Sequence, residues 1–409
     1  MNETHRHPRN RSVLVSGASI AGPAIAYWLH RYGFDVTVVE KAGTVRGGGY
    51  PIDIRGTALE VVRRMNVLPQ LQKAHVNTQG ITFVGADGST IAALRAENMG
   101  IGADGDLEVQ RGDLTEILYD AVRDSVAFMF NDSIASLDDR SDGIEVAFRS
   151  GARRTFDVVI GADGLHSNTR RLILGPEERF HHYLGACFAG FTLPNHLGLS
   201  HEGVLWNTPG RRAALYAAGS GRNVFGLLSF RRSDQPFDAF RNPDAQRELV
   251  AATFPDESWE IPRMVAEMRA AEDLFFDAVS QIRMTNWSLG RVALVGDAAY
   301  APSFLTGQGT SLALVGAYVL AGELAAHADH AEAFDAYDRV LRPFVTLNQE
   351  MANGGDTELF PATEESLQQR NDALRSLSAL PSDPPRAAYS ALTLPDYEGS
   401  QTGEPKKQR

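Results

Sequence analysis

The sequence predicts an α/β protein in which a parallel sheet with helices is joined to a second, sheet-rich domain. A short β-rich run, a helical stretch and another β-rich run follow one another at 12–16, 23–32 and 35–40. This βαβ order requires parallel strands, because the connecting helix carries the chain back along the sheet. Two further apolar runs, 157–161 and 291–296, have the continuous hydrophobic pattern of strands that are buried on both faces.

The remaining elements follow from the spacing of apolar residues. Helical spacing is present in five segments, at 57–65, 114–122, 309–327, 331–351 and, as a candidate, 368–380. Strand-like runs occur at 126–130 and 144–148, and an Asp142-Gly143 turn precedes the second of them. The stretch 180–285 has a different character, because short alternating runs are separated by Gly, Asn and Pro turns, as at 213–217 and 224–230.

Composition excludes several classes of protein. The net charge of the 409 residues is −12, which argues against general binding of nucleic acid or of an anionic membrane. The single cysteine, Cys187, rules out an intrachain disulfide and a cysteine-based zinc cluster, and we expect no metal site. The apolar run after Arg11 and the uncharged stretch 298–322 resemble targeting or membrane segments, but Gly and Pro interrupt both. We therefore expect a cytoplasmic protein.

A glycine-rich turn links the first strand to the first helix. Gly17 permits the tight turn, and Gly22 lets the helix pack closely against the strand. The free N–H groups and the positive dipole at the helix start would face a pyrophosphate. Glu40 ends the second strand, where a carboxylate accepts hydrogen bonds from a ribose diol. Ser19 replaces the usual second glycine, and a βαβ turn that binds no dinucleotide is the alternative interpretation.

Two more Gly/Asp turns follow buried strands. After 157–161, Asp163 can brace a loop by accepting backbone N–H bonds, and Gly164 allows close approach of a backbone or ligand. After 291–296, Asp297 can accept a hydrogen bond from a sugar-chain hydroxyl. Free N–H groups suited to an electron-rich carbonyl are presented at a helix start by Gly307, Gln308 and Gly309. Taken singly, each turn is equally explained as a Gly-rich loop before a helix.

Together and in this order, the three motifs resemble the FAD-dependent aromatic monooxygenases of the p-hydroxybenzoate hydroxylase type, class A flavoprotein monooxygenases similar to tetracycline-modifying and polyketide hydroxylases. The similarity extends from about residue 12 to 351. It implies a Rossmann-like FAD-binding domain of the glutathione-reductase type, made of 12–180 and 286–355. A β-sheet-rich substrate domain, 181–285, is inserted, with 70–105 as candidate further strands, and a C-terminal helix and loose tail occupy 356–409.

The resemblance also implies which residues hold the cofactor. The ADP half of FAD would contact Gly17, Ser19, Ile20, Ala21, Gly22, Glu40 and Lys41. Asp163 and Gly164 would support FAD and the reduced nicotinamide, and Asp297, next to Gly296, would bind the ribityl chain or pyrophosphate. Residues implied near the flavin are Arg46, Asp53, Arg111, Gly307, Gln308 and Gly309. Two departures from the family are Tyr300, where many relatives have His, and Pro302-Ser303-Phe304 in place of Pro-Pro.

By the same resemblance, FAD is reduced by NAD(P)H, and a flavin 4a-hydroperoxide formed with O₂ hydroxylates an aromatic or polyketide-like small molecule. The sequence has one dinucleotide turn, so NAD(P)H is expected as a co-substrate without a Rossmann domain of its own. Antibiotic biosynthesis and antibiotic resistance by inactivation are both implied. We expect a monomer or homodimer that binds a small aromatic substrate and O₂ but neither nucleic acid nor membrane.

Three other functions stay open from the sequence. A flavin halogenase is one, because Trp259, Ile261 and Pro262 match half of a Trp-x-Trp-x-Ile-Pro signature, although Glu257 replaces its first Trp. The others are an FAD-dependent prenyl-chain reductase and a non-enzymatic dinucleotide-binding regulatory protein. The Gly-Gln-Gly turn argues against the regulatory protein, which would not need it.

The sequence assigns no catalytic acid or base. Candidates by residue type alone are His166, His181, His182, His196, His201 and Tyr216. Candidates for the lining of a ring pocket, with core packing as the alternative for each, are Phe188, Phe191, Trp206, Tyr216 and Phe225.

Overall fold

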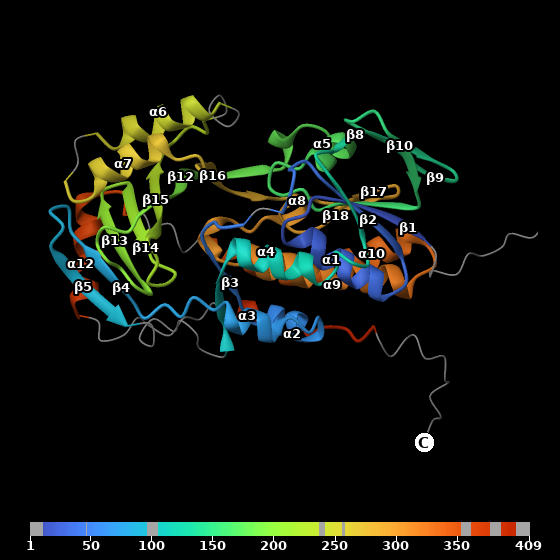
Figure 1. Ribbon diagram of the computed structural model, residues 1–409, viewed down its shortest axis with the longest axis horizontal. Helices are drawn as coiled ribbons and strands as arrows, with labels where there is room; N and C mark the ends of the chain where they lie inside the picture. Colours follow the sequence, from blue (N-terminus) through green and yellow to red (C-terminus); the bar gives the residue numbers. More distant parts are fainter. Residues whose placement is uncertain are drawn as a thin grey trace, which may run out of the picture.

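The computed structural model describes residues 11–45, 47–95, 105–236, 242–255, 258–352, 361–376 and 386–397. These residues form two sheet-based halves that lie side by side along the longest axis of the molecule (Figure 1).

One half is built on a six-stranded sheet in the order β17-β18-β11-β1-β2-β7. All neighbouring strands in it are parallel except the edge pair of β17 and β18. Their bounds are β1 Ser12–Ser16, β2 Asp35–Glu40, β7 Ala127–Phe130, β11 Val158–Gly161, β17 Ser288–Leu289 and β18 Val292–Leu294. The five parallel strands are those that the apolar runs of the sequence predict, with small shifts of their ends.

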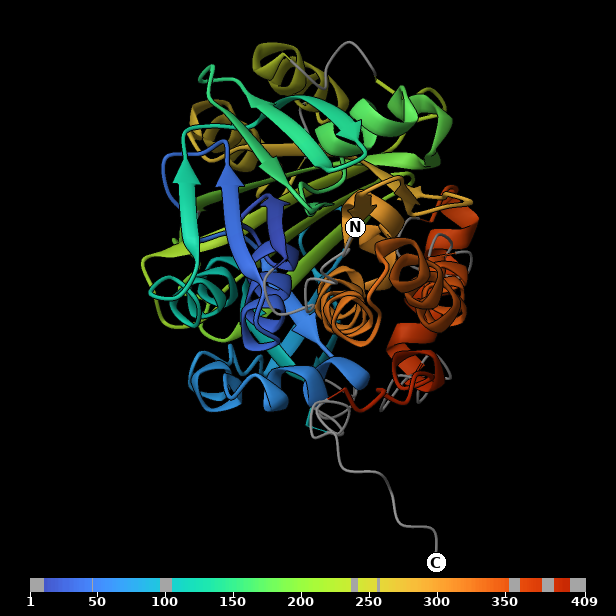
Figure 2. The same ribbon diagram turned by 90° about the vertical axis from the view of Figure 1, so that its right-hand side faces the viewer.

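Helices cover one face of this sheet, as Figure 2 shows for the bundle drawn in blue and orange. They are α1 (Ala21–Arg31), α9 (Gly309–Ala326) and α10 (His330–Glu350), with α2 (Thr57–Arg64), α3 (Leu68–Lys73) and α4 (Arg111–Asp120) beside them. Within the described residues, α9 alone is long and apolar enough to cross a membrane, and 83% of it is buried inside the protein. Its apolar surface is thus used in the core, against α1, α2 and α10.

The opposite face carries a three-stranded antiparallel sheet, β8 (Ile134–Arg140), β9 (Gly143–Phe148) and β10 (Arg153–Phe156). Val146 and Phe148 of β9 share a core cluster with Leu14 of β1 and Val159 of β11. Short elements complete this half, namely α5 (Asn168–Leu174), α8 (Asp297–Tyr300) and the 3₁₀ turns η4 (Glu177–Arg179) and η5 (Phe304–Thr306). A two-stranded ribbon, β3 (Pro51–Ile54) and β6 (Leu107–Gln110), lies toward the other half (Figure 1).

The second half is a seven-stranded sheet in the order β16-β12-β15-β14-β13-β4-β5. Its strands are β4 Gly80–Val84, β5 Thr90–Arg95, β12 His181–Pro194, β13 Glu202–Thr208, β14 Arg211–Tyr216, β15 Asn223–Arg231 and β16 Phe275–Ile282. Neighbours are antiparallel except β4 and β13, which run parallel. Two strands from 70–105 therefore extend the sheet that the later segment forms.

Two helices cover the outer face of this sheet, α6 (Pro243–Thr253) and α7 (Ile261–Ala270). Neither helix was predicted, because the surrounding sequence has the pattern of strands and turns. Each nevertheless begins with proline in its first turn, and Asn242 caps α6 by accepting hydrogen bonds from the N–H groups of Asp244 and Ala245. The half-match to the halogenase signature, at Trp259, is the start of α7.

Part of the C-terminal segment that the sequence predicts as a loose tail is packed, namely residues 386–397. A helix is present as expected, but α12 begins earlier, at Glu364–Ser376, and 377–380 lie outside the described residues. Residues 386–397, including α13 (Arg386–Tyr389), are packed: Tyr389 and Tyr397 are buried. The Tyr397 hydroxyl donates to Glu323 of α9 at 2.7 Å. Two aromatic rings with polar ends give this segment enough burial to order it.

Candidate active site

The first glycine turn is packed too tightly for side chains. A Cβ on Gly22 would lie 1.9 Å from the Gly17 carbonyl oxygen, and one on Gly17 would lie 2.5 Å from that of Ala162. Gly17 also has a φ of 107°, which glycine adopts readily. The Glu40 carboxylate accepts hydrogen bonds from the N–H of Ala18 at 2.8 Å and of Ala42 at 2.9 Å. The two parts of the predicted dinucleotide pattern, the glycine turn and Glu40, are therefore in direct contact.

Ser19, the departure from the glycine pattern, has a partner from a distant segment. The Arg111 guanidinium, at the start of α4, donates to the Ser19 hydroxyl at 2.8 Å. The N–H of Gly112 donates to the Gly48 carbonyl at 2.8 Å, so the 47–50 segment crosses the same helix start. Ser19, Arg111 and this segment are thus brought together, whereas Arg46 lies outside the described residues.

Asp297 lies in a recess against the same turn. A Cβ on the preceding Gly296 would lie 3.0 Å from Cβ of Ala21, and one on Gly309 would lie 3.6 Å from Asp297 Oδ1. Asp297 is solvent-accessible, yet burial raises the pKa of its carboxyl. The carboxyl is therefore surrounded by protein atoms yet reaches solvent. We call the region between the first helix start and the start of α9, which contains Asp297, the hollow.

The turn Gly307-Gln308-Gly309 at the start of α9, called the second glycine turn below, shows whether the residues of this hollow fit a cofactor. Gln308 is fully buried, and neither its amide nitrogen nor its amide oxygen has a partner among the described residues. Such a group costs free energy unless a bound molecule satisfies it. An unpaired amide donor and acceptor at Gln308, beside the solvent-accessible Asp297 carboxyl, are groups that the polar edge of a flavin ring and its sugar chain can satisfy, so the residues present fit FAD.

Asp53 lies beside the second glycine turn. A Cβ on Gly307 would lie 3.2 Å from Asp53 Oδ2. Burial raises the pKa of the Asp53 carboxyl to about 6, although Arg55, at 3.0 Å from the carboxylate, opposes the shift. A carboxyl that titrates near neutral pH is therefore held at the predicted flavin end of the hollow.

The Asp163 carboxylate is hydrogen-bonded within its own loop. It accepts hydrogen bonds from the N–H and hydroxyl of Thr169, both at 2.9 Å, and one from the Ser167 hydroxyl. The loop so braced lies against Gly17 through Ala162, while Gly164 has a φ of 82° and no neighbour within 4 Å of a Cβ. The Asp163 loop therefore packs against the first glycine turn and supports it.

His166, within the same loop, does not have the properties of a general base. Burial alone would lower its pKa, but hydrogen bonds to Asp277 and Glu177 raise it to about 10. The distances from its ring nitrogens are 3.2 Å to Asp277 and 2.8 Å to Glu177. His166 is thus a cation at neutral pH, and it holds β16 to the loop after β11. Burial lowers the pKa of His181 and His182.

Strand register separates the aromatic candidates into two groups. Phe191 and Trp206 are fully buried in the cluster between the sheet and helices α6 and α7, so they are core residues. Phe188, Phe225 and Tyr216 belong to the opposite face. The Phe188 ring stacks on Phe304 at 4.9 Å, and the Phe225 ring is 5.8 Å from that of Tyr50.

This second face therefore meets the glycine-rich half of the molecule. The Tyr216 hydroxyl donates to Glu108 of β6 at 2.6 Å, which joins the sheet to the ribbon that carries Asp53. Tyr50 and Glu108 were not predicted as site residues, and Phe304 was noted only as a departure from the family's Pro-Pro. Only Tyr50 had a local signal, because it follows the run Gly47–Gly49 next to the predicted flavin segment.

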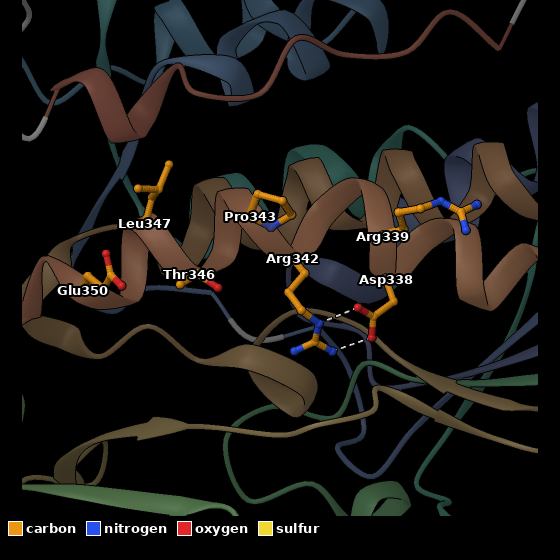
Figure 3. A pocket seen from close by; sticks show the side chains of 7 residues that line it. All are labelled: Asp338, Arg339, Arg342, Pro343, Thr346, Leu347 and Glu350. Atoms are coloured by element: carbon orange, nitrogen blue, oxygen red, sulfur yellow. Dashed lines mark hydrogen bonds and ion pairs between the residues drawn. The ribbon is translucent and has the colours of Figure 1, made fainter.

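A separate hollow lies on the surface of α10, away from these residues (Figure 3). Its volume is about 530 Å³, and it is lined by one helix only: Asp338, Arg339, Arg342, Pro343, Thr346, Leu347 and Glu350. Asp338 and Arg342 form an ion pair with each other in it. None of the predicted site residues lines this hollow, so it is not a candidate for the active site.

Comparisons with known proteins cover nearly the whole chain. The FAD binding domain family matches residues 10–351 of the chain. A flavin-dependent monooxygenase from an unidentified prokaryote is 36% identical over 393 residues, which are 95% of this chain and 100% of the relative. The crystal structure of tetracycline destructase Tet(55) superposes with a TM-score of 0.83 at 36% identity, covering 96% of this chain and 100% of that one.

A more distant structure shares the fold alone. HpxO of Klebsiella pneumoniae, solved in complex with FAD and uric acid, has a TM-score of 0.68 at 20% identity. The match covers 90% of this chain and 93% of that one.

Proposed function

Since this chain belongs to the FAD-binding-domain family of flavin-dependent monooxygenases, we propose that it hydroxylates a fused-ring phenolic or polyketide substrate of the tetracycline kind. The similarity to a tetracycline destructase extends over both halves of the molecule, the substrate-facing sheet included. That whole-length match at 36% identity carries the proposal.

The class itself follows from family membership. The chain is an FAD-dependent oxidoreductase that uses NAD(P)H and O₂, as the sequence predicted for its fold, family and cofactor. The halogenase, the prenyl-chain reductase and the regulatory protein are not favoured by the relatives. When bound, FAD takes two electrons from NAD(P)H and passes one oxygen atom of O₂ to the substrate ring, and the other leaves as water.

We assign the cofactor contacts from the geometry of the hollow. The turn from Gly17 to Gly22, with Glu40 and Lys41 at the end of β2, would hold the ADP half. Asp297 would accept from a hydroxyl of the sugar chain, and the Gln308 amide would satisfy its unpaired atoms on the flavin ring. Supporting positions around these are Arg111, Asp53, Asp163, Gly164, Gly296, Gly307 and Gly309, and the role of Arg46 remains a prediction.

The substrate would lie between the flavin end of the hollow and the inner face of the seven-stranded sheet. Tyr50, Phe188 and Phe225 supply aromatic surface there, and such surface excludes the water that would divert the oxygen chemistry. We propose the domain boundaries 12–180 with 286–355, 181–285 and 356–409 for this division, with 70–105 contributing β4 and β5 to the substrate sheet.

We propose that the protein is a cytoplasmic monomer or homodimer that binds neither nucleic acid nor membrane. Size-exclusion chromatography coupled to light scattering measures the assembly directly, and a higher oligomer would contradict this part.

The function is tested on the purified holoenzyme. NADPH and NADH oxidation are followed in air with tetracycline and with a panel of mono- to tetracyclic phenols, and products are analysed by mass spectrometry under ¹⁸O₂. We expect a polycyclic phenol to stimulate oxidation and to gain one ¹⁸O atom. Hydrogen peroxide as the only oxygen product across the panel, or a protein that stays colourless after FAD is added, would contradict the proposal.

A further inference from the structure

Two guanidinium groups lie against the inner face of the seven-stranded sheet without an acidic partner. Arg212 projects from β14, and Arg370 comes from α12, which packs on β5 and β13. In the part of the chain that the structure describes, neither side chain makes a hydrogen bond or an ion pair, and the Nε atom of each is fully enclosed. The Arg370 guanidinium lies 5.8 Å from the centre of the Phe83 ring.

Electrostatics makes this arrangement unfavourable in the absence of a ligand. Burial lowers the pKa of Arg212 to about 10, and the nearby charge of Arg370 lowers it as well. Burial also lowers the pKa of Arg370. Both groups keep their charge at neutral pH, so two like charges share a poorly hydrated place.

Other enclosed arginines of the protein are paired with a carboxylate. Arg170 lies 3.0 Å from Glu177, and Arg55 lies 3.0 Å from Asp53. Arg212 and Arg370 lack such a carboxylate. An anion would supply the partner that both groups lack among the described residues.

Strand register shows what else lies on this face. Arg212 is opposite Ser229 of β15, which is opposite Phe188 of β12. Side chains opposite each other in antiparallel strands point to the same face, so these three form one row across the sheet. The Ser229 hydroxyl is buried and has no partner among the described residues.

This row begins at the predicted flavin end of the hollow. Phe188 stacks on Phe304, which precedes the second glycine turn. Two strand spacings, about 10 Å, separate β12 from β14. A fused-ring molecule spans such a distance, so one substrate could reach from the flavin to the two guanidinium groups.

We propose that Arg212 and Arg370 form an anion-binding end of the substrate site and that the substrate carries a carboxylate or ionised enol oxygen on the ring remote from the hydroxylated atom. This inference rests on the proposed function. One oxyanion would cancel the repulsion of the pair, accept charge-assisted hydrogen bonds from both groups and leave the Ser229 hydroxyl as a further donor. Phe83 and Phe188 favour an anion attached to an aromatic ring over a bare phosphate.

The test compares matched ligands on the FAD-loaded enzyme. Naphthalene- and anthracene-carboxylates and their carboxamides are titrated, and binding is followed through the change in flavin absorbance. We expect the carboxylate of at least one pair to bind about 10- to 100-fold more tightly than its amide, as charge-assisted hydrogen bonds do. R212M and R370M should each remove this preference and leave amide affinity unchanged.

The matched control is R269M. Arg269 of α7 is exposed and pairs with Glu248 of α6, so it lies on the helical side of the sheet. This variant should keep the preference for the carboxylate. Equal affinity for carboxylate and amide in every wild-type pair, or an equal loss in R269M, would overturn the inference.

Two further measurements separate the alternatives. If R212M and R370M raise the KM for NADPH and leave the carboxylate preference intact, the anion is a cofactor phosphate and the inference is wrong.

Without ligand, R212M should unfold at an equal or higher temperature than wild type, because it removes an unpaired buried charge. A lower unfolding temperature would show that the group is satisfied internally and would also overturn it. An enzyme that keeps the preference but oxygenates no phenol would refute the proposed function alone.

Discussion

The two sides of the proposed active site are built by opposite means. The cofactor side is made of backbone: Gly17 and Gly22 leave no room for a side chain, and Gln308 is placed between two glycines. The substrate side is made of side chains that alternate along antiparallel strands, such as Phe188 and Arg212. The first side tolerates little change, whereas the second can exchange one residue at a time without moving a strand.

The largest effect is expected for Gly22→Ala, which adds a single methyl group on the cofactor side. Gly22→Ala would place a Cβ 1.9 Å from the Gly17 carbonyl oxygen, so β1 and α1 must separate. We expect a loss of at least about 3 kcal/mol in the free energy of unfolding, together with loss of bound FAD. Urea unfolding and the flavin spectrum measure both. Gly221→Ala is the matched control, since its nearest neighbour would be 3.9 Å away. Equal stability of the two variants would break the comparison.

A pH series examines Asp53, a side chain on the cofactor side. Its pKa is raised from 3.8 to about 6, so the folded protein holds a proton that the unfolded chain has already released. The contribution of Asp53 to stability is therefore complete below about pH 4 and is lost as the pH rises through about 6. The loss is at most about 3 kcal/mol. Unfolding of wild type and Asp53→Asn between pH 4 and 7.5 should converge toward low pH and favour the variant at high pH; parallel curves would contradict this.

Asp297 tests whether the recess holds the cofactor through a side chain. Asp297→Ala removes one charged acceptor, and we expect FAD affinity to fall by about 10- to 100-fold while the fold is retained. Flavin fluorescence on dilution measures the dissociation constant. Asp142→Ala, in the exposed turn before β9, is the control and should retain FAD. Full flavin occupancy of Asp297→Ala at low FAD concentration would show that the recess has another purpose.

The smallest effect is expected for Ser19 and Arg111, where a side-chain pair replaces the usual glycine. A double-mutant cycle with Ser19→Ala and Arg111→Met should give a coupling of about 1 kcal/mol in FAD binding, because the pair is joined by one charge-assisted hydrogen bond. Additive effects of the two substitutions would mean that Arg111 acts on FAD independently of Ser19. That result would sharpen the comparison, since the turn would then depend on backbone alone.

The same contrast explains what could be predicted from the sequence. Backbone requirements leave visible traces, because a position such as Gly22 admits one residue type and the strands beside it are continuous apolar runs. β1, α1, β2 and α9 were therefore predicted close to their observed bounds. That Glu40 and Asp297 belong to one site was implied by the family resemblance, and both residues lie against the first glycine turn.

Side-chain arrangements across strands leave no such trace. The row from Phe188 through Ser229 to Arg212 depends on the register of three strands, and register is set by pairing that is remote in sequence. Arg370 joins that face from a helix near the end of the chain. The helices α6 and α7 did have local signals, Asn242-Pro243 and Ile261-Pro262, but turn-like composition around them concealed the starts.

The packed C-terminal segment has a practical consequence for protein engineering. Tyr397 closes over α9 at Gly322, and Tyr389 covers Gly56 just before α2, so the end of the chain fastens together two helices of the cofactor half. Truncation before residue 386 would uncover the apolar core and promote aggregation of an otherwise complete catalyst. An affinity tag at this end should accordingly follow residue 409 and leave residues 386–397 in place.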